Sequence, residues 1–319
     1  MAAAEPTTAA LRNPLRRYFL ATRPAFLLAS LAPCFIGFAT AHWSGVTLRL
    51  ELALATLLGA ALVHAGINVL NDYYDALNGT DELNTERLFP FTGGSRFIQN
   101  GVLSTGQTAR YGALLLAAGG AIGVALALAA GPLLWLIGAA GVLLGWAYSA
   151  PPLSLNSRGF GELSVALGFG ILIPFGADYV QRGAFDLLPI AAGAPYALLV
   201  ANLLYINQFP DRRADDSAGK HHWVVRLGAR RARWGYAAAA FIAYATLAIE
   251  IATGMLPATA WLAALPAALS ATAAWRLLRY AEQPQALAPA IRFTILAALS
   301  HGLLLTIALT GAPQRLGGG

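Results

Sequence analysis

The sequence predicts an all-α polytopic membrane protein with nine transmembrane helices, and three observations support that fold class. Apolar residues make up 57% of the chain and charged residues only 11%, whereas a soluble domain carries about 25% charged residues. This much apolar surface cannot be hidden inside one globule of 319 residues, so lipid must cover part of it. The apolar residues also fall into runs of about 20, the length that crosses a bilayer as a helix.

The predicted spans follow one another closely along the chain. The first is long enough to cross the membrane, and the Ala-rich start before it lacks the form of a cleaved secretory signal, so we expect a retained helix. Spans 3 and 4 meet in a tight turn at Gly131-Pro132, and span 4 is short. No linker suggests a second domain, so residues 1–319 are expected to form a single one. The approximate spans are 19–41, 52–76, 106–130, 132–150, 160–180, 187–209, 232–253, 256–280 and 290–311.

The basic residues predict the orientation. If the N-terminus is cytoplasmic, all but three of the 21 basic residues lie on the cytoplasmic side; the exceptions are Arg49, Arg182 and Arg315. Basic loops favour the cytoplasmic face, so we expect a cytoplasmic N-terminus and a multi-pass protein of the cell inner membrane. The same loops account for the net charge of +6 without a nucleic-acid partner. The only cysteine is Cys34, so an internal disulfide is impossible.

Two pairs of aspartates stand at corresponding ends of two predicted spans. Asp72 and Asp75 close span 2, and Asp211 and Asp215 follow span 6. Spacings of three and four residues put each pair on one helix face. Both spans end at the cytoplasmic face, so the pairs are expected to lie on the same side of the membrane. The two longest loops, about 77–105 and 210–231, follow them and are candidate covers of an active site.

Other polar residues around these pairs extend the pattern. Further oxygen-bearing side chains are Asn68, Asn71, Asp81 and Asn207. Hard oxygen ligands without nearby His or Cys select Mg²⁺, which shares its remaining positions with phosphate. Basic side chains suited to a diphosphate are Lys220, Arg158, Arg96 and Arg23. Pro210 is expected to bend or loosen the last turn of the second acidic helix. The pattern predicts an enzyme that acts on a phosphorylated lipid at the membrane surface.

Two other interpretations compete with this one. The acids are alternatively ordinary helix-end residues in interfacial loops, but two spaced pairs brought to one face by topology argue against it. The chain is alternatively a secondary transporter of an anionic lipid or metabolite, because carboxylates within membranes also mark transporters. Transport usually needs ionisable groups near mid-membrane, where this chain offers mainly Glu250 and a few histidines.

Three segments carry a resemblance to a known family. They are NDYYDALNGTDELNTERLFPFTGGSRFIQNGVLS at 71–104, GWAYSAPPLSLNSRGFGE at 145–162 and NQFPDRRADDSAGKHHWVVRLG at 207–228. With them the chain resembles the UbiA superfamily of membrane prenyltransferases, and most of all the MenA branch, which prenylates 1,4-dihydroxy-2-naphthoate. Many members carry a third aspartate where this chain has Gly79, which leaves Asp81 as a candidate substitute. His221, His222 and Trp223 replace a Thr-rich stretch, and we interpret the two histidines as loop residues at the membrane interface.

The resemblance implies a UbiA-like bundle and Mg²⁺-dependent transfer of a polyprenyl group from an allylic polyprenyl diphosphate to an aromatic acceptor. The implied acceptor is 1,4-dihydroxy-2-naphthoate in menaquinone biosynthesis, with 4-hydroxybenzoate and homogentisate as alternatives. The implied catalytic residues, which hold Mg²⁺, are Asp72, Asp75, Asp211 and Asp215. Tyr148 and Tyr73 are expected to stabilise the allylic cation by cation–π attraction. The isoprenoid tail needs an apolar groove, and glycines such as Gly138 and Gly170 are expected to allow close helix packing.

Overall fold

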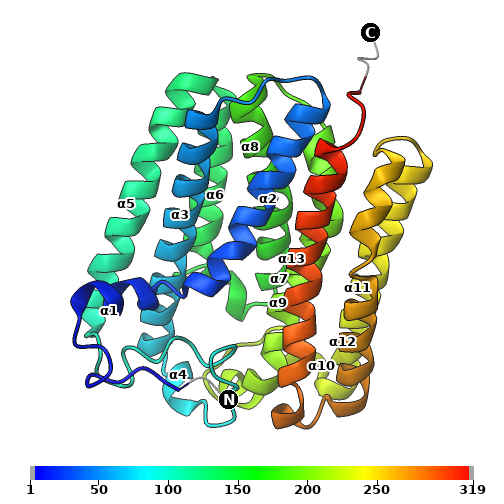
Figure 1. Cartoon of the computed structure of the whole chain (residues 1–319). Helices are drawn as coiled ribbons and strands as arrows, with labels where there is room; N and C mark the ends of the chain where they lie inside the picture. The colour runs from blue at the N-terminus through cyan, green and yellow to red at the C-terminus, as the bar shows by residue number, and fades with distance from the viewer. Residues whose placement is uncertain (1–3, 316–319) are drawn as a thin grey trace.

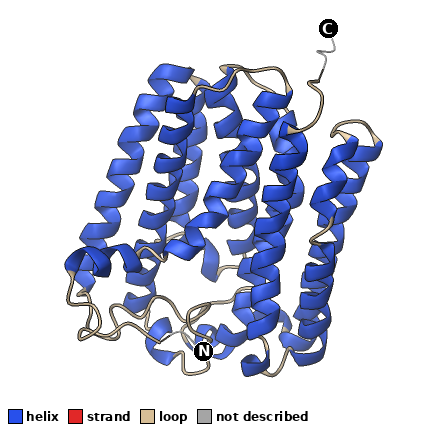
Figure 2. Cartoon of the chain, viewed as in Figure 1, coloured by secondary structure: helices blue, strands red, loops and turns tan. Residues whose placement is uncertain are grey.

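The computed structural model describes residues 4–315, and within that range every regular element is helical (Figure 2). The elements are α1 (Pro14–Ala21), α2 (Pro24–Trp43), α3 (Leu50–Leu77), α4 (Thr80–Leu83), α5 (Thr105–Ala130), α6 (Leu133–Ser149), η1 (Leu155–Ser157), α7 (Gly161–Val165), η2 (Ala166–Leu172), α8 (Ile173–Arg182), α9 (Leu188–Ser217), α10 (Trp223–Leu227), α11 (Ala229–Ala252), η3 (Ala258–Ala264), α12 (Ala267–Tyr280), η4 (Pro284–Ala286) and α13 (Ala288–Thr310).

The predicted fold class, an all-α polytopic membrane protein, is confirmed. Within the described residues, eight helical segments are long and apolar enough to cross a membrane. The remaining predicted span corresponds to α6, which is apolar but only 17 residues long. The nine segments follow the predicted spans in order, while the count of nine membrane crossings stays a prediction.

The first predicted span, 19–41, is wrong at its start. α1 ends at Ala21 and α2 begins at Pro24, with Arg23 between them in the left-handed conformation at φ 57°. The residue before a proline is disfavoured in the right-handed helical region, so the helix cannot run through Arg23. As a result α1 lies across the end of the bundle, and only α2 continues through it (Figure 1).

The expected loosening at Pro210 does not occur. α9 is one helix of 30 residues that passes through Pro210 and ends at Ser217. A proline inside a helix lacks one backbone donor, and here that loss falls close to the helix end. Asn207, Asp211 and Asp215 therefore stand four residues apart on one intact helical face.

A close contact between η2 and α9 sets the position of this helix. The Cβ of any residue at Gly170 would overlap Ala197, and a Cβ at Gly193 would overlap the backbone of Gly170. The two backbones thus approach as closely as only glycine permits. This confirms the expected packing role of Gly170. Because α7 directly precedes η2, the same contact places α7 beside the half of α9 that carries Asp211, which is the half predicted to be cytoplasmic.

The short helices and the long loops gather at one end of the bundle. α4, α10 and the described part of the N-terminal arm lie at one end, and the last turn of α13 lies at the other (Figure 1). α3 and α9 both finish at the first end, next to the loops at about 77–105 and 218–222. A small core of Leu11, Phe97, Val102 and Leu103 packs the N-terminal arm against the first of these loops.

Candidate functional site

A cavity of about 720 Å³ lies among α3, α5, α6, α9 and the continuous helical segment formed by α7, η2 and α8. One part is polar and lies where α3 and α9 end. The polar lining includes Asp75, Asp81, Asn84, Asn207, Asp211, Asp215, Lys220 and His222. The rest is mainly apolar and extends between α3, α5 and α6.

Lys220 joins the two acid-bearing helices across this cavity. Its Nζ lies 2.8 Å from Asp75 Oδ1 on α3 and 3.6 Å from Asp215 Oδ1 on α9. Burial lowers the pKa of Lys220, but the carboxylates of Asp75 and Asp215 more than offset this, so its pKa is raised overall. The ammonium group is therefore charged at neutral pH. The two distant acidic segments do meet at one place, as their helix ends predicted.

The loop between α4 and α5 holds the aspartates from the other side. The backbone N–H of Ser95 donates to Asp72 Oδ1 at 3.2 Å. Asn84 Nδ2 donates to Asp211 Oδ1 at 2.6 Å, and the N–H of Gly93 donates to Asp211 Oδ2 at 3.4 Å. The loop is thus tied to both α3 and α9. Sequence reasoning missed Asn84; its position three residues after Asp81 was the available signal.

Asp81 sits on α4 and is only 2% exposed. Gln99 Nε2 donates to its carboxylate at 3.3 Å, and Arg96 donates to its backbone carbonyl. Burial, together with the nearby Asp75 and Asp72, raises the pKa of Asp81 to about 8. Asp81 lines the cavity as well, so the structure brings this candidate substitute for the missing third aspartate to the acidic end.

His222 is a loop residue, as interpreted, but its side chain is buried beside Asp215. Its Nδ1 accepts the backbone N–H of Val225 at 3.4 Å, so Nε2 carries the ring proton of the neutral form. Nε2 lies 3.0 Å from Asp215 Oδ2 and donates to it. The neighbouring His221 is an exposed loop residue, as interpreted, and the exposed Trp223 begins α10. His222 stands two residues after Lys220 and caps the start of α10, and this position was the sequence signal that could have identified it as a site residue.

The oxygen atoms around the polar end fit Mg²⁺ that is only partly coordinated by protein. Within residues 4–315, no three His, Cys, Asp or Glu side chains converge tightly enough to form a metal cage. Mg²⁺ usually keeps several waters and shares its other positions with substrate phosphate. The buried oxygens Asn84 Oδ1 and Asn207 Oδ1 have no hydrogen-bond partner. Both residues line the cavity, and an orphaned amide oxygen is a suitable ligand for a hard cation.

The other predicted residues divide between the cavity wall and its surroundings. Asn68 and Asn71 line the cavity, and their amide nitrogens donate to Thr22 O at 3.2 Å and Ser149 Oγ at 2.9 Å. Arg23 also lines it, with its guanidinium 4.5 Å from the centre of the Phe26 ring.

Asp72 is buried behind the wall and is not among the cavity-lining residues. Arg96, Arg158 and Tyr73 are also outside the lining. Arg158 is exposed and donates to Pro152 O at 2.7 Å, and Tyr73 packs edge-on against Tyr74. Their predicted roles in diphosphate binding and cation stabilisation stay predictions.

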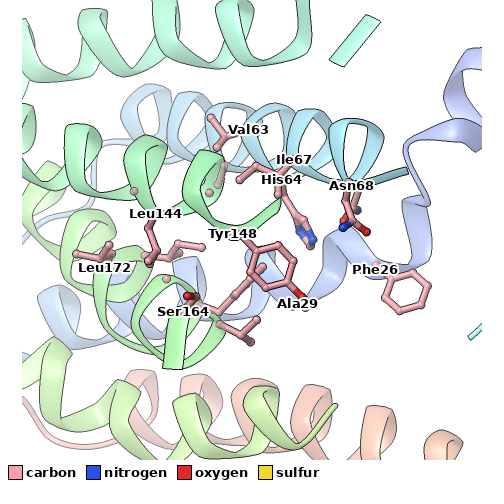
Figure 3. Close-up of a pocket in the computed structure, with 18 of the residues that line it drawn as sticks. Phe26, Ala29, Val63, His64, Ile67, Asn68, Leu144, Tyr148, Ser164 and Leu172 are labelled. Carbon is pink, nitrogen blue, oxygen red and sulfur yellow. The ribbon is translucent and has the colours of Figure 1, made fainter. Parts of the chain in front are cut away.

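Tyr148 stands at the boundary between the polar and the apolar part of the cavity. Figure 3 shows its ring between Ser164 on one side and His64 and Asn68 on the other. In the apolar part, an added Cβ at Gly138 would meet nothing within 4 Å. The expectation that Gly138 permits close helix packing was therefore wrong, because this glycine borders the cavity.

Comparison with known proteins places this arrangement in a family. The model described as the UbiA prenyltransferase family matches residues 30–300. The chain is 29% identical to a 1,4-dihydroxy-2-naphthoate octaprenyltransferase of Mycobacterium leprae and 31% identical to that of Mycobacterium tuberculosis; each match covers 90% of this chain and 94% of the relative. A solved UbiA homologue from Archaeoglobus fulgidus, bound to DMAPP and Mg²⁺, superposes with a TM-score of 0.60 at 21% identity, covering 91% of this chain and 99% of the homologue.

Proposed function

The chain belongs to the UbiA prenyltransferase family and is a membrane-embedded prenyltransferase, and on this premise we propose its substrates and cofactor. It transfers a polyprenyl group from a polyprenyl diphosphate to 1,4-dihydroxy-2-naphthoate, with Mg²⁺ at the acidic end of the cavity. The relatives named for this reaction align over nearly their whole length, which favours this acceptor over 4-hydroxybenzoate or homogentisate.

One observation carries the proposal: acids from α3 and α9 face the same cavity with a buried lysine between them. A diphosphate carries negative charge that must be neutralised when the allylic C–O bond breaks. Bound Mg²⁺ would supply most of this neutralisation. Its proposed ligands are Asp72, Asp75, Asp211 and Asp215, with Asp81, Asn68, Asn71, Asn84 and Asn207 nearby. Lys220 already lies between the two acid sets, where it would contact the leaving diphosphate.

The proposed reaction is balanced without any further reactant. The C–O bond breaks and its electron pair leaves with the diphosphate. The ring carbon that bears the carboxylate forms the new C–C bond, and loss of CO₂ returns the electron pair to the ring. Tyr148 borders the point where the polar and apolar parts meet, so its ring face would stabilise the electron-poor carbon by about 1–2 kcal/mol.

The same cavity suits the other end of the donor. Its apolar part is walled by α3, α5 and α6 and includes open space beside Gly120, Gly123, Gly138 and Gly141. A hydrocarbon chain is stabilised by leaving water for such a wall. We also propose that the N-terminus and the acidic end face the cytoplasm of the inner membrane, because the basic loops favour that side.

The test is an assay of the purified protein in detergent with polyprenyl diphosphate and a panel of the three aromatic acids, with and without Mg²⁺. We expect a prenylated, decarboxylated naphthoate product and one diphosphate for each product. Product only with another acid would refute the acceptor assignment. Full activity after chelation of divalent cations would refute the Mg²⁺ assignment.

A further inference from the structure

Gln208, which is buried, and Glu162, which is partly buried, form a hydrogen-bonded pair at the cavity wall that the reaction described above does not use. Gln208 is on α9, is 6% exposed and lines the cavity. Its Nε2 donates to Glu162 Oε1 on α7 at 2.8 Å. A carboxylate can only accept hydrogen bonds, so the amide nitrogen of Gln208 must face Glu162. The orientation of the amide is therefore set by its partner.

The consequence is an amide oxygen without a partner. Gln208 Oε1 is buried and has no hydrogen bond within the protein. A buried polar atom left in this way is destabilising, because it has lost its hydrogen bond to water without gaining another. Since the nitrogen side is held by Glu162, the oxygen is presented as an acceptor. It therefore calls for a donor from a ligand of the cavity.

The place of Gln208 along α9 indicates which ligand this is. Asp211 follows it by three residues and Leu204 precedes it by four, and both line the cavity. At a rise of 1.5 Å per residue, Gln208 lies about 4.5 Å along the helix axis from Asp211 and about 6 Å along it from Leu204. It thus stands just past the diphosphate end, where the apolar part begins. A polyprenyl donor has only hydrocarbon at that depth and offers no hydrogen-bond donor.

We propose that Gln208 Oε1 accepts a hydrogen bond from a ring hydroxyl of the aromatic acceptor, and that Glu162 is the positioning residue that holds the amide in this orientation. The inference rests on the proposed function and deepens it. It defines the acceptor as a hydroxyarene whose free O–H reaches α9 beside Tyr148. An acceptor in which that hydroxyl is a methyl ether loses the contact.

The experiment pairs a change in the protein with a change in the acceptor. Wild type and Gln208→Met are compared with the dihydroxynaphthoate and with each of its two monomethyl ethers. Methionine keeps an unbranched side chain of similar length and removes the amide oxygen. In the wild type, we expect one ether to lower kcat/KM at least about tenfold, in line with one hydrogen bond of about 1.4 kcal/mol. In Gln208→Met that preference should fall to about onefold to threefold, while the KM for the polyprenyl diphosphate stays unchanged.

Two further variants separate positioning from general damage. Glu162→Gln keeps the shape but can donate to the oxygen of Gln208, so the amide can turn and the hydroxyl preference should fall. Gln181→Met makes the same change at a buried glutamine at the opposite end, where Gln181 bonds the backbone of Arg49 and does not line the cavity. This control should keep the full preference. Thermal unfolding and donor KM check the fold of each variant.

The outcomes distinguish the two proposals. A hydroxyl preference that is equal in the wild type, Gln208→Met and Glu162→Gln would overturn this inference, even if product forms normally. The inference also fails if the wild type uses both ethers as well as the parent compound, which would mean that Oε1 is paired with a retained water. If Gln208→Met does not fold, Glu162→Gln alone decides. No prenylated product from the wild type with any acceptor would instead refute the proposed function itself.

Discussion

Replacing Lys220 by methionine is expected to tighten Mg²⁺ binding to the diphosphate-free protein while slowing turnover. The Lys220 ammonium lies 2.8 Å from Asp75 and 3.6 Å from Asp215, so it neutralises the carboxylates to which we assign the metal. Two unit charges about 4 Å apart interact by about 4 kcal/mol at an effective dielectric constant of about 20. Removing the lysine relieves repulsion of this order against an incoming cation. Water and relaxation reduce the gain, so we expect at least about tenfold tighter binding, or about 1.4 kcal/mol.

The assay is isothermal titration of Mg²⁺ into purified protein without diphosphate, followed by steady-state turnover. Turnover should fall about 100-fold, because the leaving diphosphate loses a cation that contacts it. Lys220→Arg keeps the charge and is expected to leave the Mg²⁺ affinity within about threefold of the wild type. Arg230→Met removes an exposed cation that does not line the cavity and serves as the second control. Unchanged or weaker Mg²⁺ binding by Lys220→Met would show that the lysine does not share its carboxylates with the metal.

Three further changes test separate parts of the site. Asp211→Asn keeps the shape and is expected to cut turnover at least about 100-fold with little change in thermal unfolding; retained activity would remove this residue from the metal site. His222→Ala deletes the donor to Asp215 and should weaken Mg²⁺ affinity about 10- to 100-fold, whereas equal affinity would make the histidine purely structural. Burial raises the pKa of Glu5, but hydrogen bonds from Arg87 and Asn100 outweigh it and lower that pKa overall, so its tie to the loop at 77–105 is present at neutral pH and is lost only as the pH falls through the lowered value. Glu5→Gln should therefore speed amide hydrogen exchange in that loop at pH 7; unchanged exchange would contradict a tethering role.

The helical spans and the meeting of the aspartates could be predicted from local patterns. Apolar runs indicate membrane helices, and a spacing of three or four residues defines a helix face, so Asp75 and Asp215 were placed on cavity-facing ends without knowledge of the fold. The break at Arg23 was also predictable in principle, because Pro24 follows it. The predicted span ran through it because hydropathy windows ignore backbone restrictions.

The contacts made by loops could not be predicted in the same way. Asn84 and His222 reach Asp211 and Asp215 only because their loops fold back onto α9, and no periodicity records such a return. Arg158 is a cation near glycine in a segment that resembles the family, but its side chain is exposed and bonded to its own loop, so its role in diphosphate binding stays a prediction. Gln208 was inconspicuous in sequence because its importance depends on Glu162, which lies 46 residues away.

The length of the cavity sets a limit on what the protein can enclose. On α3 its lining runs from Thr56 to Asp75, which at 1.5 Å per residue is about 28 Å. This is close to the roughly 30 Å thickness of a bilayer's hydrocarbon interior. A donor whose tail exceeds that length must leave its far units among the lipids. Membrane composition and fluidity would then influence how readily long donors enter and products depart, even though the surrounding bilayer lipids take no part in the chemistry.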